Sequence, residues 1–125
     1  MTKVFIICPV REAPPEIMEQ IRAYVAKLET DGCQVHWPPR DTDQSDPHGI
    51  NICLTNCDGI IDADEVHIWF DPASHGSDFD RGILFALLRV GFPKKVVLIN
   101  PVEPTPHKSF ANVLLALANG QNIGR

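Results

Sequence analysis

The chain has 125 residues, a formal net charge of −5 and 44% hydrophobic residues, which is typical of one globular domain and excludes a disordered chain. The acidic balance, without a cluster of Lys or Arg, argues against partners such as a nucleic-acid duplex or an anionic membrane. No apolar run is long enough for a membrane-spanning helix. We therefore predict a single domain over residues 1–125.

Strand-like apolar runs alternate with helical stripes along the chain. Strands are predicted over Lys3–Cys8, Cys33–Trp37, Glu65–Phe70 and Lys95–Ile99. Helices are predicted over Pro14–Thr30, from Asp46-Pro47 to Ile61, over Asp78–Val90 and from Ser109 to Gly120, with a polar loop over Pro38–Ser45. The inward faces of these helices are expected to be Ile17, Ile21, Tyr24, Val25 and Leu28; Ile50, Cys53, Leu54, Cys57, Ile60 and Ile61; Phe79, Ile83, Ala86, Leu87 and Val90; and Phe110, Val113, Leu114 and Leu117.

This alternation predicts an α/β fold, a three-layer α/β/α sandwich with a flavodoxin-like or Rossmann-like parallel sheet of four to five strands. Right-handed crossovers favour the strand order 2-1-3-4. In such sheets, ligands bind beyond the carboxyl ends of the strands, where the winding reverses. That point lies between the first and third strands, and it predicts a site formed by the loops Cys8–Ala13 and Asp71–Ser77.

The first of these loops reads Cys8-Pro9-Val10-Arg11-Glu12. A guanidinium at the end of a strand suits a phosphate or a carboxylate, although Arg11 could equally pair with an acid at the surface. Cys8 and Arg11 are too close together for a Cys-x5-Arg phosphatase loop. The chain also has no G-x-G-x-x-G sequence and no P-loop, which argues against dinucleotide and NTPase sites.

The second loop leads from the third strand into a helix, and small residues and hydroxyls before a helix N-terminus suit an anion or a sugar. Its candidate binding residues are Asp71, Ser74, His75, Gly76 and Ser77.

Two acids, Asp78 and Asp80, follow that loop in the first turns of the predicted helix. Either they complement the helix dipole, or Asp80 faces the ligand. Because Phe79 is expected to point to the core, Asp80 need not be buried and can face the ligand. Gly82 lies in the middle of this helix, where glycine costs about 1 kcal/mol relative to alanine, and close packing or the approach of a ligand would explain it.

Four cysteines form no Cys-x-x-Cys pair, and the chain starts with a strand-like segment without a cleavage site. Cys53 and Cys57 lie four residues apart and are expected to be small buried hydrophobes; the alternative is a metal or disulfide pair, which has no matching second pair. We therefore predict a reducing, cytoplasmic location and neither a metal nor an organic cofactor.

Three local patterns, in this order and spacing, give the chain a resemblance to the nucleoside 2-deoxyribosyltransferase family, which includes the deoxynucleoside 5′-monophosphate N-glycosidases. The first is the short strand that ends in a loop with Arg11. The second is Ala63-Asp64 before the third strand. The third is Gly76–Gly82, which is similar to a Gly-Thr-x-x-Glu-x-Gly element that opens a helix.

The resemblance implies cleavage or transfer of the N-glycosidic bond of a 2′-deoxynucleoside or its 5′-monophosphate, through a carboxylate that attacks the anomeric carbon. In this chain Asp80 would be the nucleophile and Asp64 would assist at the sugar or base. Arg11 and Ser74 would bind phosphate, together with Ser109 from a neighbouring subunit. The implied partners are a small nucleoside or nucleotide and a second copy of the chain, in a homodimer or higher oligomer.

The sequence departs from the family pattern at the nucleophile, where Asp80 replaces Glu. The loss of one methylene withdraws the carboxylate by about the length of a C–C bond, and a misplacement of about 1 Å can cost on the order of 100-fold in rate. Asp78 could raise the pKa of Asp80, and Arg81 could pair with it. The alternatives are therefore a weak or inactive relative that binds a nucleotide-like ligand, or an unrelated function on a common fold.

Overall fold

The computed structural model describes residues 1–11 and 13–125. Glu12, which belongs to the first predicted loop, lies outside the described residues. The elements in chain order are β1 (Lys3–Ile7), α1 (Pro15–Thr30), β2 (Gln34–His36), α2 (Pro38–Asp41), α3 (Ile50–Asp62), β3 (Glu65–Ile68), α4 (His75–Arg89), β4 (Lys95–Leu98) and α5 (Phe110–Ala118).

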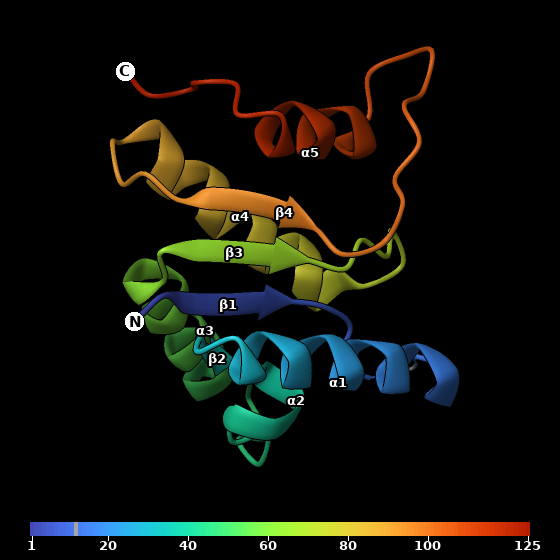
Figure 1. The fold of residues 1–125 in the computed structure, drawn as a ribbon, viewed down its shortest axis with the longest axis vertical. Coiled ribbons are helices and arrows are strands. Elements are labelled where there is room, and N and C mark those ends of the chain that lie inside the picture. Colours follow the sequence, from blue (N-terminus) through green and yellow to red (C-terminus); the bar gives the residue numbers. More distant parts are fainter. Residues whose placement is uncertain (12) are drawn as a thin grey trace.

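The strands form one parallel sheet in the order β2-β1-β3-β4, which confirms the predicted α/β fold and strand order (Figure 1). Ile7 pairs with Ile68, and Ile68 pairs with Leu98. The strands β1, β3 and β4 therefore end side by side, and the loops that follow them start at the same edge of the sheet.

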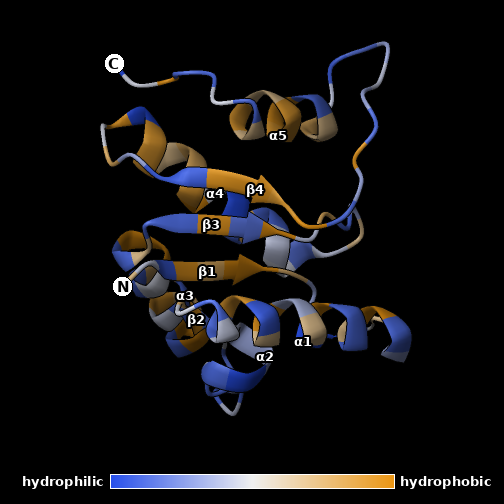
Figure 2. Cartoon of the chain, in the orientation of Figure 1, coloured by the Kyte–Doolittle hydropathy of each residue, from blue (hydrophilic) through white to orange (hydrophobic). Residues whose placement is uncertain are grey.

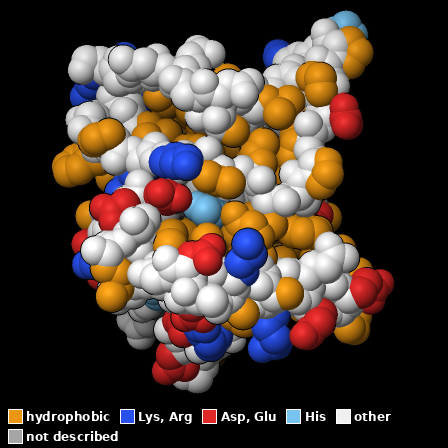
Figure 3. All heavy atoms as spheres, in the orientation of Figure 1, with side chains coloured by type: hydrophobic (Ala, Val, Ile, Leu, Met, Phe, Trp, Pro, Cys, Tyr) orange, Lys and Arg blue, Asp and Glu red, His pale blue; other side chains and the backbone are white. Residues whose placement is uncertain are grey.

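Alternate residues of β1 enter two separate cores. Phe5 and Ile7 pack with residues of α3, α4 and α5, whereas Val4 and Ile6 pack with residues of α1. Hydrophobic residues dominate β1 and β4, while β3 also carries hydrophilic ones (Figure 2). Hydrophobic side chains also gather in the hollow between α1 and α5, where the sheet is not covered by a helix (Figure 3).

The inward faces of α3 and α4 differ from the prediction. In α3 the buried residues are Asn56 and Ile60, whereas Ile50, Leu54 and Ile61 are largely exposed. In α4 the buried residues are Ser77, Asp80, Arg81 and Leu84. Phe79 and the C-cap residue Val90 are at least half exposed. The physical reason is that both helices turn polar residues toward the end of the sheet, which moves part of each apolar stripe outward.

Several helix boundaries also differ from the prediction, among them the start of α4, which lies at His75 instead of Asp78. The segment Pro38–Asp41 forms the short helix α2 instead of a loop. Helix α3 starts at Ile50, after Gly49 with a φ of 82°, a left-handed conformation that favours glycine. Asp46 is not its N-cap residue, but the Asp46 carboxylate still accepts a hydrogen bond from the Asn51 amide at 2.8 Å.

Gly59 of α3 packs directly against β1, and Gly59→Ala is expected to destabilise the fold by about 1–3 kcal/mol through overpacking. A Cβ at Gly59 would lie 2.8 Å from the ring of Phe5, which is fully buried and has no room to move. The free energy of unfolding in urea measures the effect. The control is Gly82→Ala in α4, where a Cβ would meet no described atom within 4 Å and alanine is expected to stabilise the helix by up to about 1 kcal/mol.

Candidate active site

A cleft of about 490 Å³ lies where the loops after β1 and β3 meet the first turns of α3 and α4. This volume is in the range of small-molecule sites. It is lined by Cys8, Val10 and Arg11; by Gln44, Ile52, Cys53 and Asn56; and by Asp71, Ala73, Ser74, His75, Gly76, Ser77, Phe79 and Asp80. The structure thus brings together eight of the ten site residues predicted from the sequence, at the predicted end of the sheet.

Asp80 is the most unusual group in the cleft, because its side chain is a carboxylate in a largely water-free position. Only 8% of the residue is exposed. Burial raises the pKa of Asp80 from 3.8 to about 6, and a hydrogen bond from the side chain of Asn56 acts in the opposite direction. A carboxylate with such a pKa at the wall of a cleft is typical of a catalytic site.

The neighbouring charges form a separate pair. Arg81 is paired with Asp78, and its guanidinium lies 5.0 Å from the centre of the Phe70 ring. Among the described residues, Arg81 therefore neutralises Asp78 and not Asp80, against the alternative considered from the sequence. The expectation that Phe79 points to the core is wrong, because α4 turns its Ser77–Asp80–Leu84 face toward the sheet and leaves Phe79 at the cleft, 58% exposed.

The N-terminus of α4 forms a polar wall of the cleft. Ser74 is its N-cap residue, and the Ser74 and Ser77 hydroxyl oxygens lie 2.8 Å apart. Ser77 is only 1% exposed, whereas His75 and Gly76 are exposed at the rim. Arg11 is also exposed and lines the same cleft. A guanidinium and the positive end of a 15-residue helix together favour an anion at this side.

Cys8 faces Asp80 from the end of β1. Burial and the negative charge of Asp80 raise the pKa of the Cys8 thiol to about 12. A thiol that stays protonated is a poor nucleophile, because the thiolate is the reactive form. Cys8 therefore contributes a neutral wall to the cleft, whereas the Asp80 carboxyl in the same cleft can ionise.

Two predicted site residues lie elsewhere. Asp64 precedes β3, at the amino ends of the strands, where its carboxylate accepts a hydrogen bond from the Lys3 amide at 2.8 Å. It is at the opposite end of the sheet from the cleft, so a role at the sugar or base does not fit. Asp71 follows β3 and lines the cleft instead. Ser109 caps α5 by accepting a hydrogen bond from the Asn112 amide, and it does not line this cleft.

Asn56 and Phe79 line the cleft but were not expected there from the sequence. Asn56 lies three residues after Cys53 and four before Ile60, so it occupies an inward position on an otherwise apolar helical stripe. A buried polar residue on such a stripe must find a hydrogen-bond partner, and this is the signal that could have identified it.

Within residues 1–11 and 13–125, no group of three or more metal-ligating side chains comes together. Cys8, Cys33, Cys53 and Cys57 are free cysteines. In the same part of the chain, none of the helices has the length and apolar character needed to cross a membrane.

The architecture is that of a parallel α/β sandwich with a carboxylate cleft beyond the strand ends. The Clostridium botulinum CMP N-glycosidase BcmB shares this fold, with a TM-score of 0.64 over 99% of this chain and 88% of that chain, at 19% sequence identity. No protein-family model matches the sequence, and no curated protein matches it significantly. The fold expected from the family resemblance is therefore found in a solved structure.

Proposed function

We propose that the protein cleaves the N-glycosidic bond of a nucleoside 5′-monophosphate, with Asp80 as the nucleophile. The observation that carries the proposal is the buried Asp80 carboxylate at the wall of a nucleotide-sized cleft, with an anion-attracting wall beside it. The shared fold with a CMP N-glycosidase supports the same reaction class. The free cysteines agree with a reducing, cytoplasmic location.

The reaction follows the logic of retaining glycosidases. The Asp80 carboxylate attacks the anomeric carbon, the carbon–nitrogen bond breaks, and the base leaves with the bonding electrons and takes up a proton. Water then attacks the anomeric carbon of the glycosyl ester, which releases the sugar phosphate and restores the carboxylate. If a second base attacks in place of water, the same intermediate leads to transfer.

Different walls of the cleft suit different parts of a nucleotide. Arg11, Ser74 and the N-terminus of α4 suit the phosphate, and Asp71 can accept a hydrogen bond from a sugar hydroxyl. Phe79, which is exposed at the cleft, offers an aromatic face for the base. The family resemblance implies that Ser109 of a partner subunit completes the phosphate site in a homodimer. The chain's own Ser109 lies outside this cleft.

The test is chromatography of nucleosides and their 5′-monophosphates, in ribo and deoxy forms, after incubation with the protein. Free base is expected with the unmodified protein and not with Asp80→Ala. Asp64→Asn is the matched control, because this acid lies at the far end of the sheet and its loss should leave base release intact. Base release that persists in Asp80→Ala would contradict the proposal.

Arg11 is expected to act on binding rather than on the chemical step. Arg11→Ala should raise the KM for a 5′-monophosphate by about tenfold, because one charge-assisted contact at an exposed site is lost. The kcat should change little. The control is the corresponding nucleoside, which has no phosphate. Its KM should not change in Arg11→Ala. Equal losses with both substrates would place Arg11 outside the phosphate site.

A second candidate is a binding module that no longer catalyses, favoured by Asp80 in the place of the longer Glu. In that case a monophosphate raises the melting temperature and no base is released. Asp80→Glu separates the two functions. A large gain in base release would show a site that is intact but limited by the reach of its carboxylate.

A further inference from the structure

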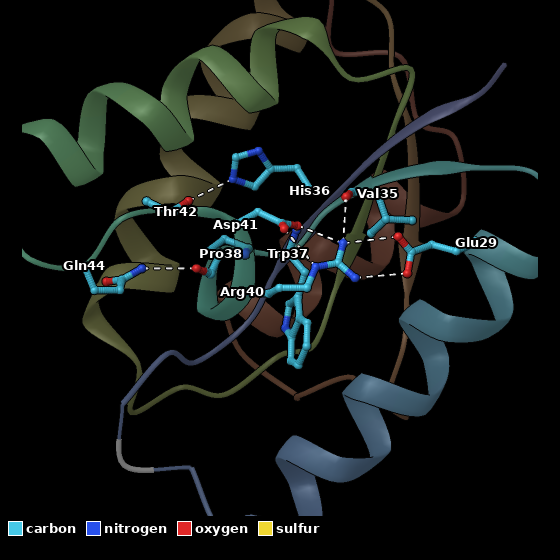
Figure 4. Close-up of polar contacts among 9 residues, drawn as sticks. All are labelled: Glu29, Val35, His36, Trp37, Pro38, Arg40, Asp41, Thr42 and Gln44. Carbon is cyan, nitrogen blue, oxygen red and sulfur yellow. Dashed lines mark hydrogen bonds and ion pairs between the residues drawn. The ribbon is translucent and has the colours of Figure 1, made fainter.

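A chain of buried polar groups leads from Asp80 away from the cleft. Asn56 and Asp80 line the same cleft, and the Asn56 side chain acts on the Asp80 carboxyl by lowering its pKa. The Thr42 hydroxyl donates to Asn56 Oδ1 at 2.7 Å. His36 Nε2 lies 2.8 Å from the same Thr42 oxygen (Figure 4). Thr42, Asn56 and Asp80 are 4%, 6% and 8% exposed, so water does not compete for these contacts.

The direction of each hydrogen bond in this chain follows from counting protons. Thr42 has one hydroxyl hydrogen, and it goes to Asn56 Oδ1. The Thr42 oxygen must then accept from His36, which requires the imidazole to carry its proton on Nε2. Because Asn56 Oδ1 is occupied, its NH₂ group is the part left to face Asp80. Each group thereby fixes the orientation of the next.

We propose that His36, Thr42 and Asn56 are positioning residues, which hold an N–H donor against the Asp80 carboxylate and so keep it ionised and oriented. Without the Thr42 hydroxyl, the hydrogen bond that fixes the Asn56 amide is lost. The amide can then rotate and turn its oxygen toward the carboxylate. The electrostatic part of this proposal concerns Asp80 alone. Its consequence for catalysis rests on the proposed function.

The short helix α2 anchors the far end of this chain. Arg40 donates to Glu29 of α1 at 3.0 Å and to Asp41 at 2.8 Å, and the Asp41 carboxylate accepts from the Trp37 amide at 2.8 Å (Figure 4). These bonds hold the backbone that places Thr42, the next residue. Burial lowers the pKa of His36, against the effect of Asp41, and so favours the neutral imidazole. The proton count requires only that the imidazole carry a proton on Nε2.

The groups that face Asp80 come from several elements. Asn56 reaches it from α3, and the Cys8 thiol faces it from the end of β1. Arg11 and Asp71 line the same cleft. Among these groups, Asn56 is the one whose hydrogen bond lowers the pKa of the Asp80 carboxyl. A change in Thr42, which touches none of the other three, therefore isolates the Asn56 contact.

The experiment is a ¹³C NMR titration of the aspartate carboxyl carbons, with the Asp80 signal assigned by its absence in Asp80→Asn. Thr42→Val has nearly the same shape but no hydroxyl, and it is expected to raise the pKa of Asp80 by about one unit, the effect of one hydrogen bond to a charged group. Thr42→Ser keeps the hydroxyl and should titrate like the unmodified protein. Asn56→Leu removes the donor directly and should give the same rise as Thr42→Val.

An unchanged Asp80 titration in folded Thr42→Val, or an equal rise in Thr42→Ser, would overturn the proposal. If Thr42→Val does not fold, Thr42→Ala takes its place, with the same two outcomes. The acid limb of kcat/KM for base release should move with the titration, by the same amount. If the Asp80 titration moves in Thr42→Val but the unmodified protein releases no base, the positioning role stands and the proposed function fails. If the unmodified protein releases base but the Asp80 titration does not move, the proposed function stands and the positioning role fails.

Discussion

Asp80→Asn is expected to make the protein more stable above pH 7, by up to about 3 kcal/mol in the free energy of unfolding. The gain arises because a buried carboxylate whose pKa is about two units above its ordinary value is destabilised in its charged form, and each unit corresponds to about 1.4 kcal/mol. The amide has a similar shape, carries no charge and can still accept from Asn56. Urea denaturation at pH 8 measures the difference.

The gain should depend on pH in a defined direction. Between about pH 4 and pH 6 the folded protein binds more protons than the unfolded chain, so the free energy of unfolding falls as the pH rises through this window. Above about pH 6 the whole cost is present, and below about pH 4 Asp80 is protonated in both states. The stabilities of Asp80→Asn and of the unmodified protein should therefore converge at pH 4.

Asp78→Asn is the matched control, with the same substitution two residues away and the opposite expected sign. Asp78 is partly exposed and paired with Arg81, whose guanidinium is buried. Loss of the Asp78 charge leaves a buried cation without its partner, which should destabilise the protein by about 1–3 kcal/mol. A stabilising effect of both substitutions would mean that the result reflects the overall negative charge and not the burial of Asp80.

The sheet could be predicted from the sequence because its strands are continuous apolar runs separated by helices of the right length. Topology rules then leave few arrangements, and the order β2-β1-β3-β4 is one of them. The position of the cleft follows from topology as well, without any motif. Arg11 and Ser74 reach the cleft because they belong to loops that the strand order brings to one edge, and Ser77 lies in the first turn of the helix that follows the second loop.

The helix faces could not be predicted in the same way, because hydropathy assigns polar residues to the outside. In α3 and α4 the cleft and the polar chain behind it need Asn56, Ser77 and Asp80 inside, and the apolar Leu54 and Phe79 are displaced outward. Local pattern and final structure disagree where a site requires it. The prediction that Asp64 belongs to the site failed for another reason. It relied on a short resemblance and did not consider at which end of the strand the residue lies.

If Asp80 is the nucleophile, kcat/KM for base release should fall about tenfold for each pH unit well below about 6, or about 100-fold between the plateau at pH 8 and pH 4. The reason is that only the ionised carboxylate can attack the anomeric carbon, and kcat/KM reports the ionisation of the free enzyme. A nucleoside is the better substrate for this measurement, because phosphate monoesters lose their second proton near the same pH. The initial rate at low substrate concentration, from pH 4 to pH 8, gives the profile.

His75 provides the control for this profile, because imidazoles ordinarily titrate in the same range of pH and His75 lines the cleft. His75→Gln should leave the acid limb in place, since its side chain is almost fully exposed at the rim and is not hydrogen-bonded to Asp80. Loss of the limb in this variant would assign it to the imidazole. A limb that stays in His75→Gln and coincides with the NMR titration of Asp80 would tie catalysis to Asp80, the buried carboxylate among the described residues of the cleft.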